Sequence, residues 1–262
     1  MKLNKLTASL IAASAMAFAS GAQAITVAGV TWNENSIFDF EAKTSLYETI
    51  GVDVGDTFDG YGLITSLNGS AAFCANCELT YEFGGFTITK AATPGDLSFT
   101  ADGGWLTVYV QDTGAGFTSF DPENKSSATD GDVWLELEGS SAFFDSTALY
   151  LPGTTIVGAV TTPNDSGTSG QGTGYFDVVG GLAAAYLDTN GEPGGADFTY
   201  TSSFQDIGSD IVNGGIIVAT HSGTNEVTGT TEVAQVPEPA TLALLGLGLV
   251  GLGLARRNKK VA

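Results

Sequence analysis

The sequence has very few of the residues that carry metal, redox or nucleophilic chemistry. Its 262 residues include one histidine and two cysteines. A Ser-His-Asp or Cys-His arrangement would have to use His221, and no Gly-x-Ser-x-Gly elbow accompanies that residue. A zinc site would need further His or Cys ligands, which the chain does not supply. We therefore interpret His221 as a surface or loop residue, and we expect neither an enzyme nor a metal centre.

Basic residues are also scarce, at 9 Lys and Arg against 29 Asp and Glu. Most of them lie at the two chain ends, which leaves only Lys43, Lys90 and Lys125 in the body. Between residues 25 and 236, 28 acidic residues oppose these three lysines, a formal charge of −25. Such a surface repels phosphate backbones, so we exclude nucleic acid as a partner. The acidity favours solubility outside the cell and attracts divalent cations.

No long amphipathic helix and no internal repeat is visible; instead, short runs alternate apolar and polar residues with period two. Two hairpins are predicted, one turning at Gly84-Gly85 and one at Asp102-Gly103-Gly104. Further strands are predicted at 25–32, 61–67, 133–137, 154–161, 198–204 and 211–220, with one short helix within 179–187. About ten such strands predict an all-β fold, a single antiparallel β-sandwich, with which a jelly-roll connection is compatible.

The N-terminus has the three parts of a secretory signal peptide. Lys2 and Lys5 precede an apolar stretch from Leu6 to Phe18, and Ala22-Gln23-Ala24 is a small-residue cleavage site. We predict a signal peptide over residues 1–24, cut between Ala24 and Ile25.

The C-terminus also has three parts in a fixed order. A rigid Pro237-Glu238-Pro239 tripeptide precedes an apolar run, predicted as a transmembrane segment over 240–255. A basic cluster follows, made of Arg256, Arg257, Lys259 and Lys260, and the positive-inside rule keeps it cytoplasmic. Prolines on both sides of Glu238 hold the backbone extended, which suits an enzyme groove that binds an extended peptide.

The C-terminal tail resembles the PEP-CTERM sorting domain of Gram-negative, exopolysaccharide-producing bacteria. The features that carry the resemblance are Val236-Pro237-Glu238-Pro239, the Leu/Gly span and Arg256-Arg257. The resemblance implies recognition by exosortase, an integral-membrane cysteine transpeptidase, and removal of the tail near the tripeptide. It also implies that the inner membrane holds the protein transiently before it reaches the cell surface or the medium. The alternative is an ordinary single-pass anchor.

These signals divide the chain. We predict an acidic β-sandwich domain over 25–221, a Thr/Gly linker over 222–235 and the sorting signal over 236–260. Within the domain, 112–132 and 162–174 are predicted loops, and the second contains Gly170-Gln171-Gly172-Thr173-Gly174, interpreted as low-complexity loop.

The two cysteines form a Cys74-Ala75-Asn76-Cys77 motif directly before a predicted strand. A redox role would need a helix after the first cysteine, and a metal role would need more ligands. We therefore favour a local structural disulfide between Cys74 and Cys77.

Calcium is the one cofactor that the acidic loops suggest. Asp188, Asn190 and Glu192 have the spacing of an EF-hand loop, but Pro193 and Thr199 stand where glycine and glutamate belong, so the motif fails. Oxygen ligands could instead come from Asp53, Asp56 and Asp59, or from Asp130 and Asp132. Turn chemistry explains the same residues equally well.

The sequence therefore predicts an exported, non-enzymatic protein of the cell surface or biofilm matrix. A carbohydrate-binding adhesin of the exopolysaccharide matrix is the first alternative, and a secreted glycan hydrolase using two carboxylates is the second. Aromatic residues could stack on sugars in an adhesin; the candidates are Trp32, Trp105, Trp134, Tyr61, Tyr109 and Tyr175.

Overall fold

The structure is a computed structural model that describes residues 24–33, 36, 39–114, 117–140, 142–144, 150–152, 154–163 and 168–232. Gln23–Val233 forms one compact unit. The predicted signal peptide and the predicted sorting signal, including the transmembrane segment 240–255, lie outside the described residues. Within the described ranges, no helix combines the length and apolar character needed to cross a membrane.

The unit consists almost entirely of strands. They are β1 (Ala24–Val27), β2 (Val30–Asn33), β3 (Phe40–Thr49), β4 (Thr57–Leu67), β5 (Cys77–Lys90), β6 (Ser98–Asp112), β7 (Asp132–Gly139), β8 (Ala142–Phe144), β9 (Tyr150–Pro152), β10 (Ile156–Val160), β11 (Gly170–Gly180), β12 (Phe198–Asn213) and β13 (Ile216–Gly229). The short helix α2 (Ala184–Leu187) lies within the predicted range 179–187, and 3-10 turns cover Lys125–Ala128 and Pro193–Gly195.

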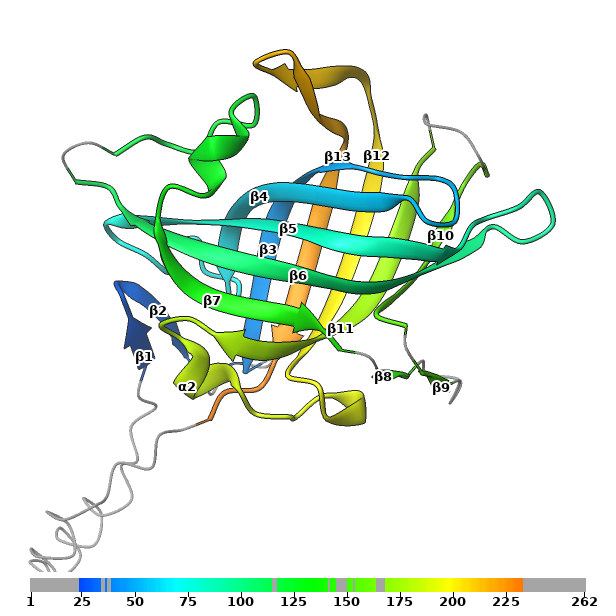
Figure 1. Cartoon of the computed structure of the whole chain (residues 1–262). Helices are drawn as coiled ribbons and strands as arrows, with labels where there is room; N and C mark the ends of the chain where they lie inside the picture. Colours follow the sequence, from blue (N-terminus) through cyan, green and yellow to red (C-terminus); the bar gives the residue numbers. More distant parts are fainter. Residues whose placement is uncertain are drawn as a thin grey trace, which may run out of the picture. The chain divides into compact units, whose positions relative to one another are not determined.

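Nine strands form one continuous antiparallel sheet in the order β13-β12-β11-β10-β6-β5-β4-β3, with β7 paired to both β11 and β6. The edge strands β3 and β13 lie side by side: Lys43 Nζ is 3.6 Å from Glu226 Oε2, and Thr220 Oγ1 donates to the Glu48 carbonyl at 3.5 Å. The sheet thus rolls over itself, and β5 and β6 cross in front of β12 and β13 (Figure 1). The all-β antiparallel prediction is confirmed, although both layers belong to one sheet.

Aromatic side chains fill the space between the two layers of this rolled sheet. Phe86 on β5 packs edge-on against Phe176 on β11, with ring centroids 5.9 Å apart. Phe40 on β3 contacts Trp134 on β7 at 6.4 Å and Phe198 on β12 at 5.6 Å. Burial of these rings is the main stabilising contribution, at roughly 1.5–3 kcal/mol for each large apolar side chain.

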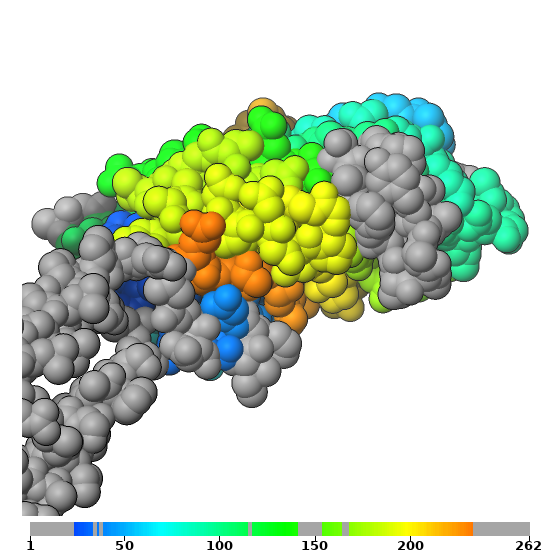
Figure 2. Space-filling model, turned by 90° about the horizontal axis from the view of Figure 1, so that it is seen from below, coloured from blue at the N-terminus to red at the C-terminus, as the bar shows by residue number. Residues whose placement is uncertain are grey.

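The β1–β2 hairpin and α2 close one end of the rolled sheet. Trp32 on β2 packs edge-on against Trp134 and against Tyr186 on α2. Its indole Nε1 donates to Thr231 Oγ1 at 3.2 Å, just after β13 ends. In Figure 2 the beginning of β3 (blue) lies beside the end of β13 (orange) at the surface of the unit. Both ends of the described chain therefore meet at this closed end.

The two predicted glycine hairpins are wrong, because β5 and β6 each continue through their glycines. The register is uninterrupted there, with Phe83 opposite Leu106 and Phe86 opposite Gly103. Gly85, Gly103 and Gly104 all have positive φ, and a Cβ on Gly104 would overlap the Phe86 ring. Glycines with positive φ can bend a strand without ending it, and in the sequence such a glycine pair looks the same as a hairpin turn. The chain turns instead between Thr93 and Asp96.

Two other predicted segments are corrected. Gly170–Gly174 begins strand β11 and is no loop; a Cβ on Gly170 would meet the Phe204 ring, so glycine makes room for that side chain. The predicted linker over 222–235 starts inside β13, which pairs with β12 as far as Gly229. Thr/Gly-rich composition is compatible with a strand when a neighbouring strand supplies hydrogen bonds.

Candidate functional site

The disulfide loop lies beside the β1–β2 hairpin. The structure joins Cys74 to Cys77, with Cα atoms 5.4 Å apart, and Cys77 is the first residue of β5. The preceding residue Phe73 accepts a hydrogen bond at its carbonyl from the Thr31 amide at 2.8 Å. The disulfide therefore lies next to the β1–β2 hairpin, which includes Ile25.

The interpretation of His221 as a surface or loop residue is wrong. His221 lies in β13 and is fully buried. Its Nε2 is 3.0 Å from the Thr168 carbonyl, and its Nδ1 is 2.7 Å from Thr220 Oγ1. Burial lowers the pKa of His221 below its usual value, which favours the neutral ring. The alternation of β13 would have revealed this burial if the segment had been recognised as a strand.

Two of the acidic residues considered for calcium have other partners in the structure. Asp56 Oδ2 accepts the amides of Val52 and Asp53 at 3.1 and 3.0 Å, whereas Asp59 pairs with Lys125. The described residues contain no group of three or more His, Cys, Asp or Glu side chains placed to hold a metal ion.

The turn that resembles an EF-hand loop in spacing is held by a residue outside that motif. Buried Asp197 accepts the amides of Val178, Thr189 and Asn190 at 2.7, 2.6 and 2.6 Å. Glu192 Oε2 accepts the Thr199 hydroxyl at 2.7 Å. A carboxylate that accepts hydrogen bonds from several backbone amides stabilises a turn. Turn stabilisation was the alternative to calcium binding for these residues.

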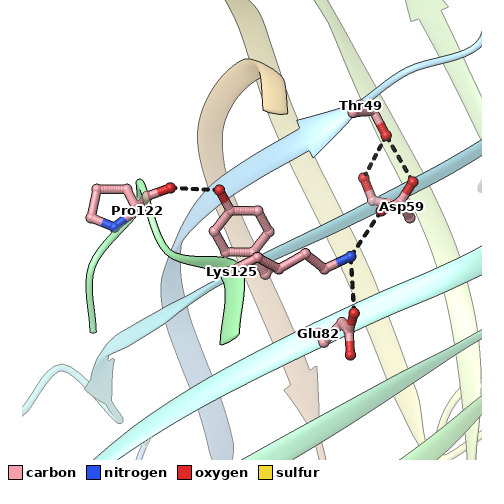
Figure 3. Close-up of polar contacts among 6 residues, drawn as sticks. Thr49, Asp59, Glu82, Pro122 and Lys125 are labelled. Carbon is pink, nitrogen blue, oxygen red and sulfur yellow. Dashed lines mark hydrogen bonds and ion pairs between the residues drawn. The ribbon is translucent and has the colours of Figure 1, made fainter. Parts of the chain in front are cut away.

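A lysine attaches the long segment between β6 and β7 to the outer face of the sheet (Figure 3). Lys125 Nζ lies 3.0 Å from Asp59 Oδ2 on β4 and 2.9 Å from Glu82 Oε1 on β5. The Thr49 hydroxyl donates to Asp59 Oδ1 at 2.8 Å, and Tyr61 donates to the Pro122 carbonyl at 2.6 Å. Both carboxylates and the lysine are partly exposed, and the network fixes this loop against β4 and β5.

Most of the candidate stacking aromatics belong to the core. Trp32, Trp134, Tyr61 and Tyr175 are buried. Trp105 is 40% exposed. Tyr109 lies on the same face of β6, because side chains two and four residues apart on a strand point to the same side. Glu138 on β7 is directly opposite Trp105. This outer face combines exposed aromatic surface with carboxylate acceptors.

Glu48 is an ionisable residue that the sequence analysis missed. It lies on β3 in the row that faces the core, which also contains Phe40, Ala42, Thr44 and Leu46. Only 4% of Glu48 is exposed, and its Oε1 has no hydrogen-bond partner. Burial, with a smaller contribution from Asp59, raises the pKa of Glu48 to about 8. Period-two alternation through residues 40–48 is the signal that could have found it.

Comparison with known families supports the prediction of a sorting motif in the C-terminal tail. The PEP-CTERM protein-sorting motif matches residues 235–259. No match was found among curated proteins, and none among solved structures. This motif implies a secreted protein that transits a membrane and reaches the cell surface. The chain therefore contains a PEP-CTERM protein-sorting motif in its C-terminal segment, and this motif implies exosortase as the processing partner.

Proposed function

We propose that this protein is a non-enzymatic component of the cell surface or biofilm matrix, delivered there as an acidic all-β domain. The observation that carries the proposal is the sorting motif at residues 235–259, because it assigns the route by which the domain leaves the cell. The signal peptide over residues 1–24 supplies the first step of that route. The formal charge of −25 keeps the released domain soluble and separated from other anionic surfaces.

The sorting step can be tested at the tripeptide. Replacement of Pro237-Glu238-Pro239 by three alanines removes the extended, proline-flanked segment while leaving the apolar run and the basic cluster in place. We expect the full-length variant to accumulate in the inner membrane. Intact mass spectrometry of membrane, surface and medium fractions measures this, and the matched control replaces Glu232 and Val233, which precede the matched motif, by alanine.

The control variant should lose its tail as the unmodified chain does. Normal release of the Pro237-Glu238-Pro239 variant would refute processing at this motif. Mature protein that still carries Leu242 to Arg257 would identify the tail as an ordinary membrane anchor.

A carbohydrate-binding adhesin is the second candidate, and exposed Trp105 favours it. An indole on an open sheet face provides a flat surface for a sugar ring, and the neighbouring carboxylate of Glu138 provides an acceptor for sugar hydroxyls. Trp105→Ala should weaken binding to the producer's own exopolysaccharide at least tenfold. Ile216→Ala, at an exposed residue on the distant β12–β13 hairpin, is the control and should bind normally.

The same assay distinguishes the hydrolase alternative. Binding without turnover across a panel of glycans supports the adhesin. Release of shorter glycan, abolished by substitution of one Asp or Glu, would instead establish a hydrolase. Equal binding by the Trp105→Ala variant and the unmodified protein would remove Trp105 from the proposal.

A further inference from the structure

A small cavity lies inside the rolled sheet, at the end opposite the Trp32 cluster. The turns after β3, β5 and β10 border it, and its volume is about 50 Å³. Apolar side chains from both layers form most of its wall, among them Phe58, Ile88, Phe99, Ile156 and Phe204. The cavity is well below the ~150 Å³ that admits benzene, so it fits a few atoms or the end of a short chain.

Glu48 provides the one carboxyl group among the described residues that line this cavity, and no lysine, arginine or histidine lines it. The side chain is 4% exposed, and Oε1 lacks a hydrogen-bond partner. An unpaired polar atom in such an environment destabilises the folded protein, because the hydrogen bonds that it made to water are not replaced. A ligand that supplies the missing hydrogen bond would recover part of this lost stability.

The charge state of Glu48 limits the chemistry of the ligand. The ionisable groups coupled to Glu48 are Asp59, Tyr81 and Tyr200, none of which is cationic. Burial and the Asp59 carboxylate raise the Glu48 pKa to about 8, so the group is mostly neutral at pH 7. A neutral carboxyl group donates one hydrogen bond and accepts others, as a hydroxyl or carbonyl oxygen requires.

We propose that this cavity binds a small neutral molecule with a short apolar chain and one hydroxyl or carbonyl oxygen, which hydrogen-bonds to Glu48. The apolar wall receives the chain, and the oxygen pairs with the carboxyl group. A carboxylate ligand would place a second negative charge near the Asp59 carboxylate in a strongly acidic protein. An ammonium ligand would require Glu48 to release its proton.

The experiment compares four ligands that share one alkyl chain: 1-butanol, butyrate, butylammonium and 1-chlorobutane. The exported protein, labelled with ¹⁵N and purified from the producer, is titrated at pH 7, and amide shifts of Gly51, Ala92 and Gly172 are followed. We expect saturable shifts with 1-butanol. The dissociation constants of butyrate and 1-chlorobutane should be at least tenfold weaker. Butyrate brings a negative charge into an apolar cavity near Asp59, and 1-chlorobutane offers no oxygen to the carboxyl group.

Two variants test the role of Glu48. Glu48→Gln keeps a donor and an acceptor and should bind 1-butanol within about threefold of the unmodified protein. Glu48→Leu removes both and should bind it at least tenfold more weakly. If the leucine variant does not fold, the comparison of 1-butanol with 1-chlorobutane on the unmodified protein still decides the question.

Three outcomes would overturn the proposal. They are the absence of saturable shifts with 1-butanol, unchanged 1-butanol binding by folded Glu48→Leu, and tighter binding of butylammonium than of 1-butanol. The last result would identify the cavity as a cation site. None of them bears on tail processing, so the proposed function is tested separately.

Discussion

At the scale of single residues, burial determines the protonation of Glu48 and His221. Glu48 faces the core from β3 without a cation beside it, and its pKa rises to about 8. His221 is buried between Thr168 and Thr220, and its pKa falls. Desolvation is the main cause in both cases, because it disfavours the charged form of an acid and of a base alike.

The raised pKa of Glu48 predicts a specific dependence of stability on pH. Below pH 4.5 the group is protonated in both folded and unfolded chains, so it has no effect on their difference. Between pH 4.5 and 8 the unfolded chain loses this proton first, and the folded state is progressively destabilised. Glu48→Gln removes the titration, so its free energy of unfolding should exceed that of the unmodified protein at pH 9, on the order of a few kcal/mol.

Urea denaturation at pH 4 and pH 9 measures this difference. The two proteins should differ little at pH 4, where Gln and protonated Glu are similar in shape and polarity. A constant difference at both pH values would show that Glu48 has an ordinary pKa in the folded protein.

At the scale of elements, residues 117–131 between β6 and β7 are attached to the sheet's outer surface. Its Phe120 amide donates to Glu78 Oε1 at 2.8 Å, and Thr80 Oγ1 donates to the Ala128 carbonyl at 2.8 Å. Lys125 adds the two ion pairs with Asp59 and Glu82. Side chains from β4 and β5 therefore position a segment that lacks strands of its own.

Lys125→Met should loosen this loop. The substitution leaves two neighbouring carboxylates without their cation, and the partly exposed site limits the loss of stability to about 1 kcal/mol. Hydrogen exchange at the Phe120 and Ser127 amides should accelerate more than global stability falls. Lys90→Met, which breaks an exposed pair with Asp96, is the matched control and should leave both measurements unchanged. Equal effects of the two variants would contradict the role of Lys125.

At the scale of the whole molecule, negative charge opposes the compact state. The segment from residue 25 to 236 has 28 acidic residues and three lysines, and each lysine lies within 4 Å of at least one carboxylate. The remaining carboxylates repel one another across the surface. Export as an acidic domain thus gives solubility at some cost in stability.

Added salt should therefore raise the melting temperature at pH 7. Screening shortens the reach of charge repulsion from about 30 Å at 0.01 M to about 8 Å at 0.15 M ionic strength. Differential scanning calorimetry in sodium, magnesium and calcium chloride at equal ionic strength measures the effect. Equal shifts in magnesium and calcium would indicate screening alone, whereas a larger shift in calcium would establish a specific calcium site. A lower melting temperature in salt would contradict charge repulsion as a net destabilising force.

Strand content and the C-terminal sorting motif could both be predicted from the amino-acid sequence. Alternation is a local property, so the runs at 133–137 and 198–204 were recognised as strands. The sorting motif is likewise a local pattern, and the match at 235–259 agrees with its prediction.

Which glycine pairs bend a strand, which ones end it, and which distant residues come into contact depend on the tertiary structure. Gly84-Gly85 lies inside a continuous strand because β6 pairs with β5 on both sides of it, with Trp105 opposite Gly84 and Gly103 opposite Phe86. Lys125 reaches Asp59, 66 residues away, only because the loop folds back over β4. The environment of Glu48 is built from strands distant in sequence, so its raised pKa has no local signature. Contacts between distant segments depend on how the sheet rolls, and short-range periodicity carries no information about that.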